Sequence, residues 1–438
     1  QSQGSMGLSY RWGPTEQTWI KLGRSLDDAL IRNYPALFTL NPLQGVLGLA
    51  SRPRKQFSDL QLRHTMDLRP GTRWSAALEH VAEKQSSQTL AEGLISASTP
   101  AGELLYADRL AFGGTNAIDR RYTAFTLEGS HRYNPMLNLD GALGWQQIRH
   151  RVLGANIYAL DLLGQVDGNI AQRHDTERVF TPRAGLVLQP APGHTLRLAY
   201  QDWMRPLSTS TLAGIETAGI PVEDQLLEAG GRHKRAVLQW SQEWGASTFI
   251  KLRADHLRMT NPGTIGVDLR TPSLPFLEEL RNAQLTNLSS TDLLEDTPSY
   301  EGGTLKVLAG SVNHMFSRQW SGYAKYLYQH SHSAFGEGDE RVTGRMIPYI
   351  PRHTAVLGAT WASSARWYLS GRAVYRSERF EDKENLTRRP PGWNLDLMGF
   401  WESTDKRWVV GMAALNLWGP KSARQKARFV LDARDEHG

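Results

Sequence analysis

Basic side chains recur at alternate positions inside short apolar segments of this sequence. In residues 248–256, Lys251, Arg253 and Asp255 alternate with Ile250 and Leu252. Because alternate residues of a β-strand point to the same face, the charged side chains share one face and the apolar side chains share the other. Guanidinium and ammonium groups gathered on one face can bind anions or carboxylate-bearing sugars.

Other residue patterns were weighed for catalysis and metal binding. His330 and His332 stand two residues apart near the end of a predicted strand, where they could share a metal ion, although no third ligand accompanies them. Serine, histidine and acidic residues are scattered, and no motif singles out a nucleophile, so we predict no enzymatic activity, no metal and no cofactor. The glycine pairs at 113–114 and 302–303 are typical of turns or bulges, not of phosphate-binding loops.

The alternating pattern continues along the whole chain, which predicts an all-β protein. The hairpin of residues 181–206 shows it most clearly, because Leu196, Leu198 and Tyr200 share one face and the turn at 190–193 is tight. About 18 strands of roughly 8–15 residues repeat this design with no separate core, a length that crosses a bilayer when tilted. We therefore predict a single transmembrane antiparallel up-and-down β-barrel over residues 1–438, located in the bacterial outer membrane.

The composition is consistent with this prediction. The 438 residues contain no cysteine, which excludes disulfides and cysteine-based zinc sites. Mean hydropathy is −0.45, but half of each barrel strand faces water, so this value is a poor indicator of membrane location. No run approaches the roughly 18 apolar residues that a transmembrane helix needs. A mildly basic surface or a cationic lumen would explain the formal net charge of +6 equally well.

The connections between the predicted strands alternate in length. Tight turns are predicted at 70–72, 134–135, 190–193, 245–247, 317–318, 363–365 and 404–406, and long extracellular loops at 86–118, 151–175, 207–229 and 261–300. Within the last loop, residues 273–285 are predicted to form a short amphipathic helix that packs on the rim or folds into the lumen. We expect irregular structure at 27–43, followed by separate strands at 44–51 and 57–69. If 44–51 were not a strand, the number of strands in the barrel would be odd.

Aromatic side chains stand at many strand ends, as they do at the two membrane interfaces of outer-membrane barrels. The chain contains 14 tryptophans, and a soluble β protein would have little reason to place so many at strand ends. We predict two aromatic girdles that include Trp145, Tyr200, Tyr328, Trp361, Trp367, Trp393 and Trp401.

The opposite face of the strands is predicted to line the lumen. It would carry the cations Arg183, Arg197, Lys251, Arg253, Lys325, Arg372 and Arg376 and the carboxylates Glu128, Asp140, Asp255 and Asp396. Two interpretations stay open. The cations and carboxylates either pair and fill the lumen, or the cations guide anionic solutes along it.

Two parts of the chain resemble known barrel families. Residues 181–206 (TPRAGLVLQPAPGHTLRLAYQDWMRP) resemble a hairpin common in TonB-dependent receptor barrels, and ALNLWG at 414–419 is similar to the end of their penultimate strand. Residues 194–230 and 347–380 more closely resemble outer-membrane barrels that follow a periplasmic tetratricopeptide-repeat domain. This second resemblance covers most of the chain from residue 178 onward and implies exopolysaccharide export.

The sequence differs from both families in what surrounds the barrel. It contains neither the helical repeats nor a receptor plug, and it ends in DARDEHG instead of on an aromatic residue. With no signal peptide and no initiator Met, we expect a mature or trimmed portion of a longer precursor.

Three functions follow as hypotheses. The first is an outer-membrane conduit, the barrel of a system that exports exopolysaccharide or another polymer. The second is a plug-less nutrient-uptake barrel of the TonB-dependent receptor type. The third is a surface-exposed binding scaffold, such as a phage or partner receptor, that uses the loops at 86–118 and 261–300. We expect outer-membrane lipid and lipopolysaccharide as partners, together with a polysaccharide and periplasmic proteins, and no nucleic acid.

Overall fold

The structure is a computed structural model that describes all residues except 1, 41–42, 99–103, 161–164, 208–210, 224–226, 228, 262–301, 335–342, 382–384, 418–425 and 434–438. The described chain forms one large antiparallel sheet of 18 strands, which confirms the predicted all-β, up-and-down fold. Among the described residues, no helix has the length and apolar character needed to cross a membrane.

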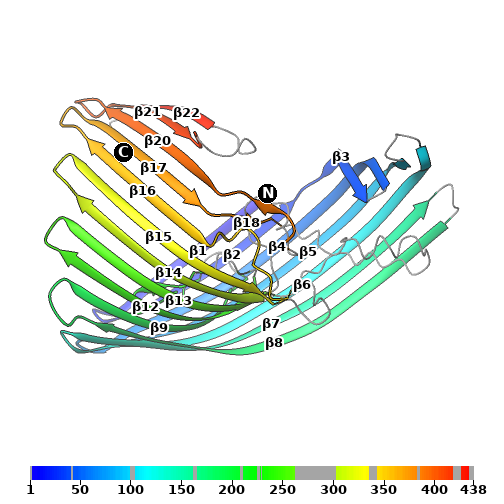
Figure 1. The fold of residues 1–438 in the computed structure, drawn as a ribbon. Coiled ribbons are helices and arrows are strands. Elements are labelled where there is room, and N and C mark those ends of the chain that lie inside the picture. Colours follow the sequence, from blue (N-terminus) through cyan, green and yellow to red (C-terminus); the bar gives the residue numbers. More distant parts are fainter. Residues whose placement is uncertain are drawn as a thin grey trace.

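The strands follow one another around the sheet almost in chain order (Figure 1). They are β1 (Ser2–Gly13), β2 (Glu16–Asp28), β3 (Ile31–Leu40), β4 (Leu43–Arg69), β5 (Thr72–Ser98), β6 (Leu104–Asn134), β7 (Leu137–Leu160), β8 (Gln165–Leu188), β9 (His194–Met204), β12 (Arg232–Trp244), β13 (Thr248–Thr260), β14 (Gly302–Met315), β15 (Trp320–Ser333), β16 (His353–Ala362), β17 (Trp367–Arg376), β20 (Gly392–Glu402), β21 (Trp408–Leu415) and β22 (Lys426–Ala433). Two small hairpins lie outside the sheet: β10 (Glu216–Thr217) with β11 (Ile220–Pro221), and β18 (Arg379–Phe380) with β19 (Arg388–Arg389).

The sheet curves into the wall of a barrel (Figure 1). Because side chains alternate between its two faces, one face presents a band of exposed apolar residues such as Leu8, Leu238, Leu369 and Leu397. Within the described residues, no pairing joins the outer edges β1 and β22. The predicted tight turns are confirmed, because β4–β5, β8–β9, β12–β13, β16–β17 and the other turn-linked pairs are joined by short connections at one end of the sheet.

Two of the four predicted long loops are wrong. Residues 86–98 belong to β5 and residues 104–118 to β6, which are 27 and 31 residues long. Residues 151–160 belong to β7 and residues 165–175 to β8, which have 24 residues each. β7 and β8 stay paired in unbroken register up to Leu160 and Gln165, and β5 and β6 do so up to Ala97, where the register shifts. Serine, glycine and threonine are common in these stretches, which is why their composition resembles that of a loop. Alternate residues nevertheless point to the same face of the sheet, as in any strand. The predicted loop at 261–300 lies almost wholly outside the described residues, as does its predicted helix at 273–285.

The N-terminal part also departs from the predicted layout. Residues 44–51 and 57–69 form the single strand β4, which continues through Pro53 without a break. Pro53 is tolerated because its nitrogen faces the gap between the end of β2 and the start of β3, where no ladder hydrogen bond needs a donor. Residues 27–43, predicted to be irregular, contain the end of β2 and the strand β3. Both β2 and β3 pair with β4, at its turn-side half and its far half respectively.

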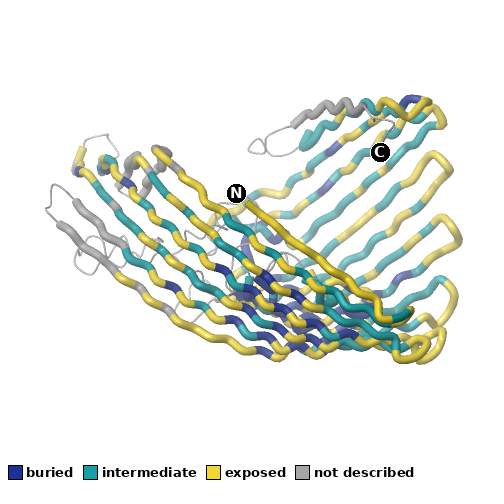
Figure 2. Tube along the Cα trace, turned by 180° about the vertical axis from the view of Figure 1, so that it is seen from behind, coloured by how far each residue is buried: buried dark blue, intermediate teal, exposed yellow. Residues whose placement is uncertain are grey.

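The buried residues gather in one part of the sheet and are not spread evenly along it (Figure 2). One apolar cluster combines strand residues with residues of two connections that lie against the concave face. Its members are Trp203, Leu227, Leu257, Met259, Leu305, Ile347 and Ile350. A second cluster joins Leu207 to side chains of β5–β9, among them Tyr122 and Ile148. The concave side therefore has a packed core of its own, built by the connections after β9 and after β15.

Candidate functional site in the lumen

Residues 211–223, called the lumen segment below, cross the inner wall of the barrel. The segment contains the hairpin β10–β11, whose two turn residues Ala218 and Gly219 have φ values of 55° and 66°. Positive φ at both positions is the signature of a type I′ turn, which glycine favours at the second position. The segment contacts side chains from β4 to β13, which it can do only from the concave side of the sheet. The predicted loop at 207–229 is therefore folded inward over residues 211–223.

Arg183 fastens the lumen segment to the wall. Its Nη1 donates to the carbonyl of Gly214 at 2.6 Å, and its Nη2 donates to Glu128 Oε1 at 2.7 Å. Arg63 binds the other carboxylate oxygen of Glu128 at 3.2 Å, and Ser75 donates to the same oxygen at 2.8 Å. The Arg183 side chain is only 3% exposed, so its charge is neutralised by Glu128 in a site from which water is largely excluded.

A second contact holds the turn of the hairpin. The backbone N–H of Ala218 donates to both oxygens of Asp140, at 2.8 and 3.1 Å. Gly185 makes this possible, because a Cβ there would lie 2.1 Å from Asp140 Oδ1 and 2.7 Å from Ala218 N. The site therefore needs glycine at 185 for the close approach of the segment to the wall.

The far end of the segment is held by a four-residue charge network. Arg235 Nη2 lies 2.8 Å from Asp255, and Arg253 Nε lies 2.7 Å from the same carboxylate. Glu223 of the segment pairs with both arginines, at 3.2 Å from Arg235 and 2.8 Å from Arg253. Arg235 also donates to the carbonyl of Pro221 at 3.2 Å. Two arginines and two carboxylates balance one another, so this end of the segment is electrostatically neutral.

All eleven predicted lumen residues lie on the concave face, as the cross-strand register from β6 to β20 requires. The structure brings Arg183 together with Glu128, Arg253 with Asp255, and Arg372 with Asp396 at 2.5 Å. The other four cations make no ion pair with a described residue: Arg197, Lys251, Lys325 and Arg376. Lys325 instead lies over the ring of Tyr323, 5.3 Å from its centre.

Several lumen residues were missed from the sequence. Gln61 accepts a hydrogen bond from Leu212 N at 2.8 Å, Glu79 accepts one from Thr211 at 2.9 Å, and Gln201 donates to the carbonyl of Ile220 at 2.9 Å. The alternation of side chains along each strand does indicate that these three residues face the lumen. Their partners are mostly main-chain groups of a segment far away in sequence, which no local pattern indicates.

The predicted girdle residues fall into two rows on the outer face. Near the turn ends, Trp361 pairs with Trp320 and Trp367 pairs with Trp401, with ring centres 6.3 and 6.2 Å apart. Roughly eight residues further along the strands, Trp393 of β20 stands opposite Tyr375 of β17, with ring centres 5.2 Å apart. Trp145, Tyr200 and Tyr328 also lie about eight residues from their turns, a distance of roughly 25 Å along a strand. This spacing suits the two interfaces of the apolar band.

His330 and His332 lie with their Nε2 atoms 2.8 Å apart, so one ring donates a hydrogen bond to the other. In the part of the chain that the structure describes, no group of three or more histidine, cysteine, aspartate or glutamate side chains is arranged to hold a metal ion. The pair is therefore a hydrogen-bonded pair on the outer face.

A family model described as the β-barrel of TonB-dependent receptor-like proteins matches residues 296–417. No curated protein sequence matches the chain. The match extends from the start of β14 to β21, and the matched family consists of receptors, not enzymes. Together with the aromatic rows, it supports the predicted bacterial outer-membrane location and the predicted likeness to TonB-dependent receptor barrels. The tetratricopeptide-linked likeness finds no support in these comparisons.

Several solved structures are similar to this chain at low sequence identity, and one of them has a TM-score above 0.5. The ferric yersiniabactin uptake receptor FyuA from Yersinia pestis has a TM-score of 0.61 at 12% identity, over 98% of this chain and 59% of that one. The chain therefore spans about three fifths of the length of that receptor. The ferric-catecholate import receptor Fiu from E. coli K12 (closed form) has a TM-score of 0.47 at 8% identity, over 95% of this chain and 75% of that one. The siderophore receptor PiuA from Acinetobacter baumannii has a TM-score of 0.42 at 10% identity, over 98% and 77%.

Proposed function

We propose that this chain forms the barrel of an outer-membrane receptor that takes up a ferric chelate, in a process energised through a TonB-type partner. The observation that carries the proposal is the family match over residues 296–417, which covers the strands from β14 to β21. The fold likeness to FyuA is consistent with it. These findings favour the nutrient-uptake hypothesis over polymer export.

The lumen adds a physical argument for uptake. A polymer exporter needs a continuous wide path, whereas here the lumen segment is anchored across the wall by Arg183, Asp140 and the network around Asp255. A segment held at three places favours a gated passage over a permanently open one.

The inner wall also offers charge for an anionic cargo. Lys251 and Lys325 flank Ser311 in one cross-strand row, and Arg376 lies on the same wall. None of the three forms an ion pair with a described residue. Cations in a confined lumen attract anions, and many ferric chelates carry net negative charge.

The test is transport by the complete native protein. A strain that lacks the gene is complemented with wild type or with the K325Q/R376Q variant, and uptake of radioactive iron is measured with a panel of anionic and neutral ferric chelates under iron limitation. The proposal expects uptake of at least one anionic chelate that disappears when the energy-coupling partner is deleted and falls in the variant. Normal iron uptake with every chelate in the deletion strain, together with loss of polysaccharide release, would support the exporter instead.

A further inference from the structure

The outer face of β12–β15 carries basic side chains aligned in cross-strand rows. In the first row, Lys234 of β12 stands opposite Arg258 of β13, and Arg258 stands opposite Thr304 of β14. Thr304 in turn faces His332 of β15. Three of the four positions in this row are therefore basic.

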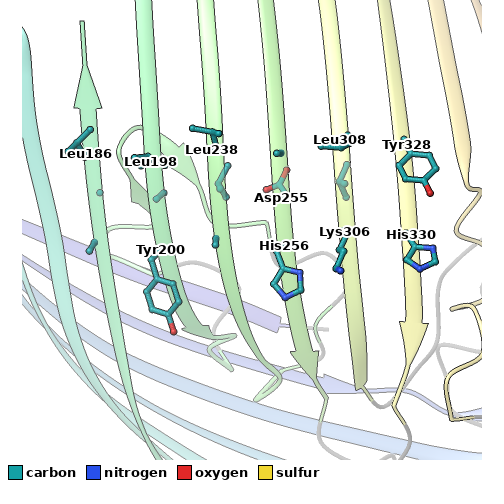
Figure 3. A pocket seen from close by; sticks show the side chains of 17 residues that line it. Leu186, Leu198, Tyr200, Leu238, Asp255, His256, Lys306, Leu308, Tyr328 and His330 are labelled. Carbon is teal, nitrogen blue, oxygen red and sulfur yellow. The ribbon is translucent and has the colours of Figure 1, made fainter. Parts of the chain in front are cut away.

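The neighbouring row, two residues closer to the short turns, repeats the pattern. His256 of β13 stands opposite Lys306 of β14, which stands opposite His330 of β15. Figure 3 shows these three side chains at one level across the three strands. His330 is close enough to Lys306, Arg352 and His332 to interact with their charges. Six basic side chains thus share one patch of the outer face, called the basic patch below.

The basic patch is unfavourable on its own. Like charges directly opposite one another on a sheet repel, so Lys234 beside Arg258 destabilises the pairing unless an anion lies between them. Within the described residues, no carboxylate pairs with Lys234, Arg258 or Lys306. The carboxylate in the same row, Asp202, already receives hydrogen bonds from Arg232 to both of its oxygens, at 2.7 Å each. An anion from outside this part of the chain would offset the repulsion within the patch.

An apolar surface lies directly beside the basic patch, towards the short turns. The next row places Leu238, Leu308 and Tyr328 on the outer face, with Leu198 and Leu186 continuing it over β9 and β8 (Figure 3). Leu238 is 45% exposed and Leu308 is 58% exposed. A groove runs across this junction and is lined by both kinds of side chain, from Leu198 and Leu238 to His256 and Lys306.

The junction lies at the membrane boundary on the side of the long connections. Tyr200 and Tyr328 belong to the aromatic row that is farther from the short turns, and the basic patch lies at or just beyond that row. In outer-membrane barrels the longer connections face the cell exterior. A ligand of the junction therefore sits in the outer leaflet, with phosphate at the level of the cations and acyl chains against the leucines.

We propose that the basic patch and the adjoining leucines bind one lipopolysaccharide molecule, through the phosphates and acyl chains of its lipid A. Guanidinium and ammonium groups form strong charge-assisted hydrogen bonds with phosphate. The four strands are spaced about 4.8 Å apart, so the patch is roughly 14 Å wide, enough for two phosphates on one sugar headgroup. The proposal depends on the outer-membrane location and not on the uptake function.

The test is lipid binding by the purified full chain in detergent. Native mass spectrometry is used to titrate wild type and the K234Q/R258Q/K306Q variant with hexa-acylated, bisphosphorylated lipid A. Each removed cation is expected to weaken binding roughly fivefold, which makes the triple variant about 100-fold weaker. The matched control R24Q/K84Q/R121Q removes three exposed, outward-facing cations from β2, β5 and β6, and should bind lipid A within twofold of wild type.

Three further measurements identify the ligand and guard against misfolding. The L238A/L308A variant keeps the charges and should lose affinity for lipid A while binding the deacylated, phosphorylated disaccharide as wild type does. Phosphatidylglycerol and inorganic phosphate should not compete at equal concentration. Equal lipid A binding by the triple variant and wild type would overturn the proposal. So would competition by inorganic phosphate, which would make the patch a site for free anions, or a change only in self-association, which would make it a contact between copies.

Discussion

Arg183 and Glu128 lie 2.7 Å apart on the inner wall, and the same guanidinium binds the carbonyl of Gly214 at 2.6 Å. The pair joins β8 to β6 and both strands to the lumen segment. One ion pair therefore connects the barrel wall to the chain that crosses its interior. Removing this ion pair tests whether the lumen segment restricts passage.

Replacing Arg183 with Met should release the lumen segment. Glu128 would keep Arg63 but lose the partner on its other oxygen, and Gly214 would lose its donor. Breaking a buried pair from one side costs about 3–5 kcal/mol. We expect a loss of that size in unfolding by urea in detergent, and a higher single-channel conductance in planar bilayers. The control is Arg109→Gln, whose partner Glu92 is 58% exposed; this change should cost less than about 1 kcal/mol. Unaltered conductance in a folded Arg183→Met protein would mean that the segment does not restrict the lumen.

Adding one methyl group at Gly185 should displace the hairpin turn. The new Cβ would stand 2.1 Å from Asp140 Oδ1, so Asp140 or the turn must move. We expect Gly185→Ala to lower the free energy of unfolding by about 1–3 kcal/mol, as overpacking does. It should also expose residues 211–223 to proteolysis in folded barrels. Gly113→Ala is the control, because nothing lies within 4 Å of its Cβ position. Equal protease sensitivity in both variants would show that close approach at Gly185 is unimportant.

A charge on the lipid face should cost more than the same charge on the lumen face. Leu397 points outward, four residues from both Trp393 and Trp401, so it lies near the middle of the apolar band. Leu397→Arg should destabilise the barrel by about 2–4 kcal/mol in lipid. Its neighbour Met398 points to the lumen, and Met398→Arg should change stability far less. Folding titrations in liposomes compare the two variants, and equal losses would contradict the assignment of faces.

Removing unpaired lumen cations should change ion selectivity. In the 438-residue chain, K325Q/R376Q lowers the positive potential of the inner wall, so the reversal potential in a salt gradient should shift towards cation preference. The variant K84Q/R121Q removes two cations from the outer face and serves as the control. If the charged residues only fill the lumen, both variants will have wild-type selectivity.

The residues that face lipid were the easiest to predict. Alternation such as that of Leu238 and Trp240 against Gln239 and Ser241 fixes which face of β12 is apolar, and the tight turns fix the hairpin partners. The same alternation predicts which residues face the lumen, and every predicted lumen residue lies on the concave face.

Two features could not be derived from local pattern. The upper parts of β5 and β6 rise beyond the apolar band, where neither face needs to be hydrophobic, so Ser86, Ser87 and Gly93 resemble loop residues. The lumen segment is held mainly through its main chain, at Leu212, Gly214 and Ala218. Main-chain contacts place no requirement on side-chain type at these three positions, and the partners of Thr211 and Glu223 are far away in sequence, so local pattern does not reveal the position of the segment.

Because the strands differ in length, the barrel wall is higher on one side of the opening than on the other. Strands β4–β8 have 24–31 residues, whereas β9 and β12–β17 have 10–14. At about 3.3 Å per residue, the difference amounts to roughly 30–70 Å along the strand. The longer strands β4–β8 extend beyond the others on one side of the barrel (Figure 1). Over the described strands, an object at the opening therefore meets a lower wall at β9 and β12–β17 than at β4–β8.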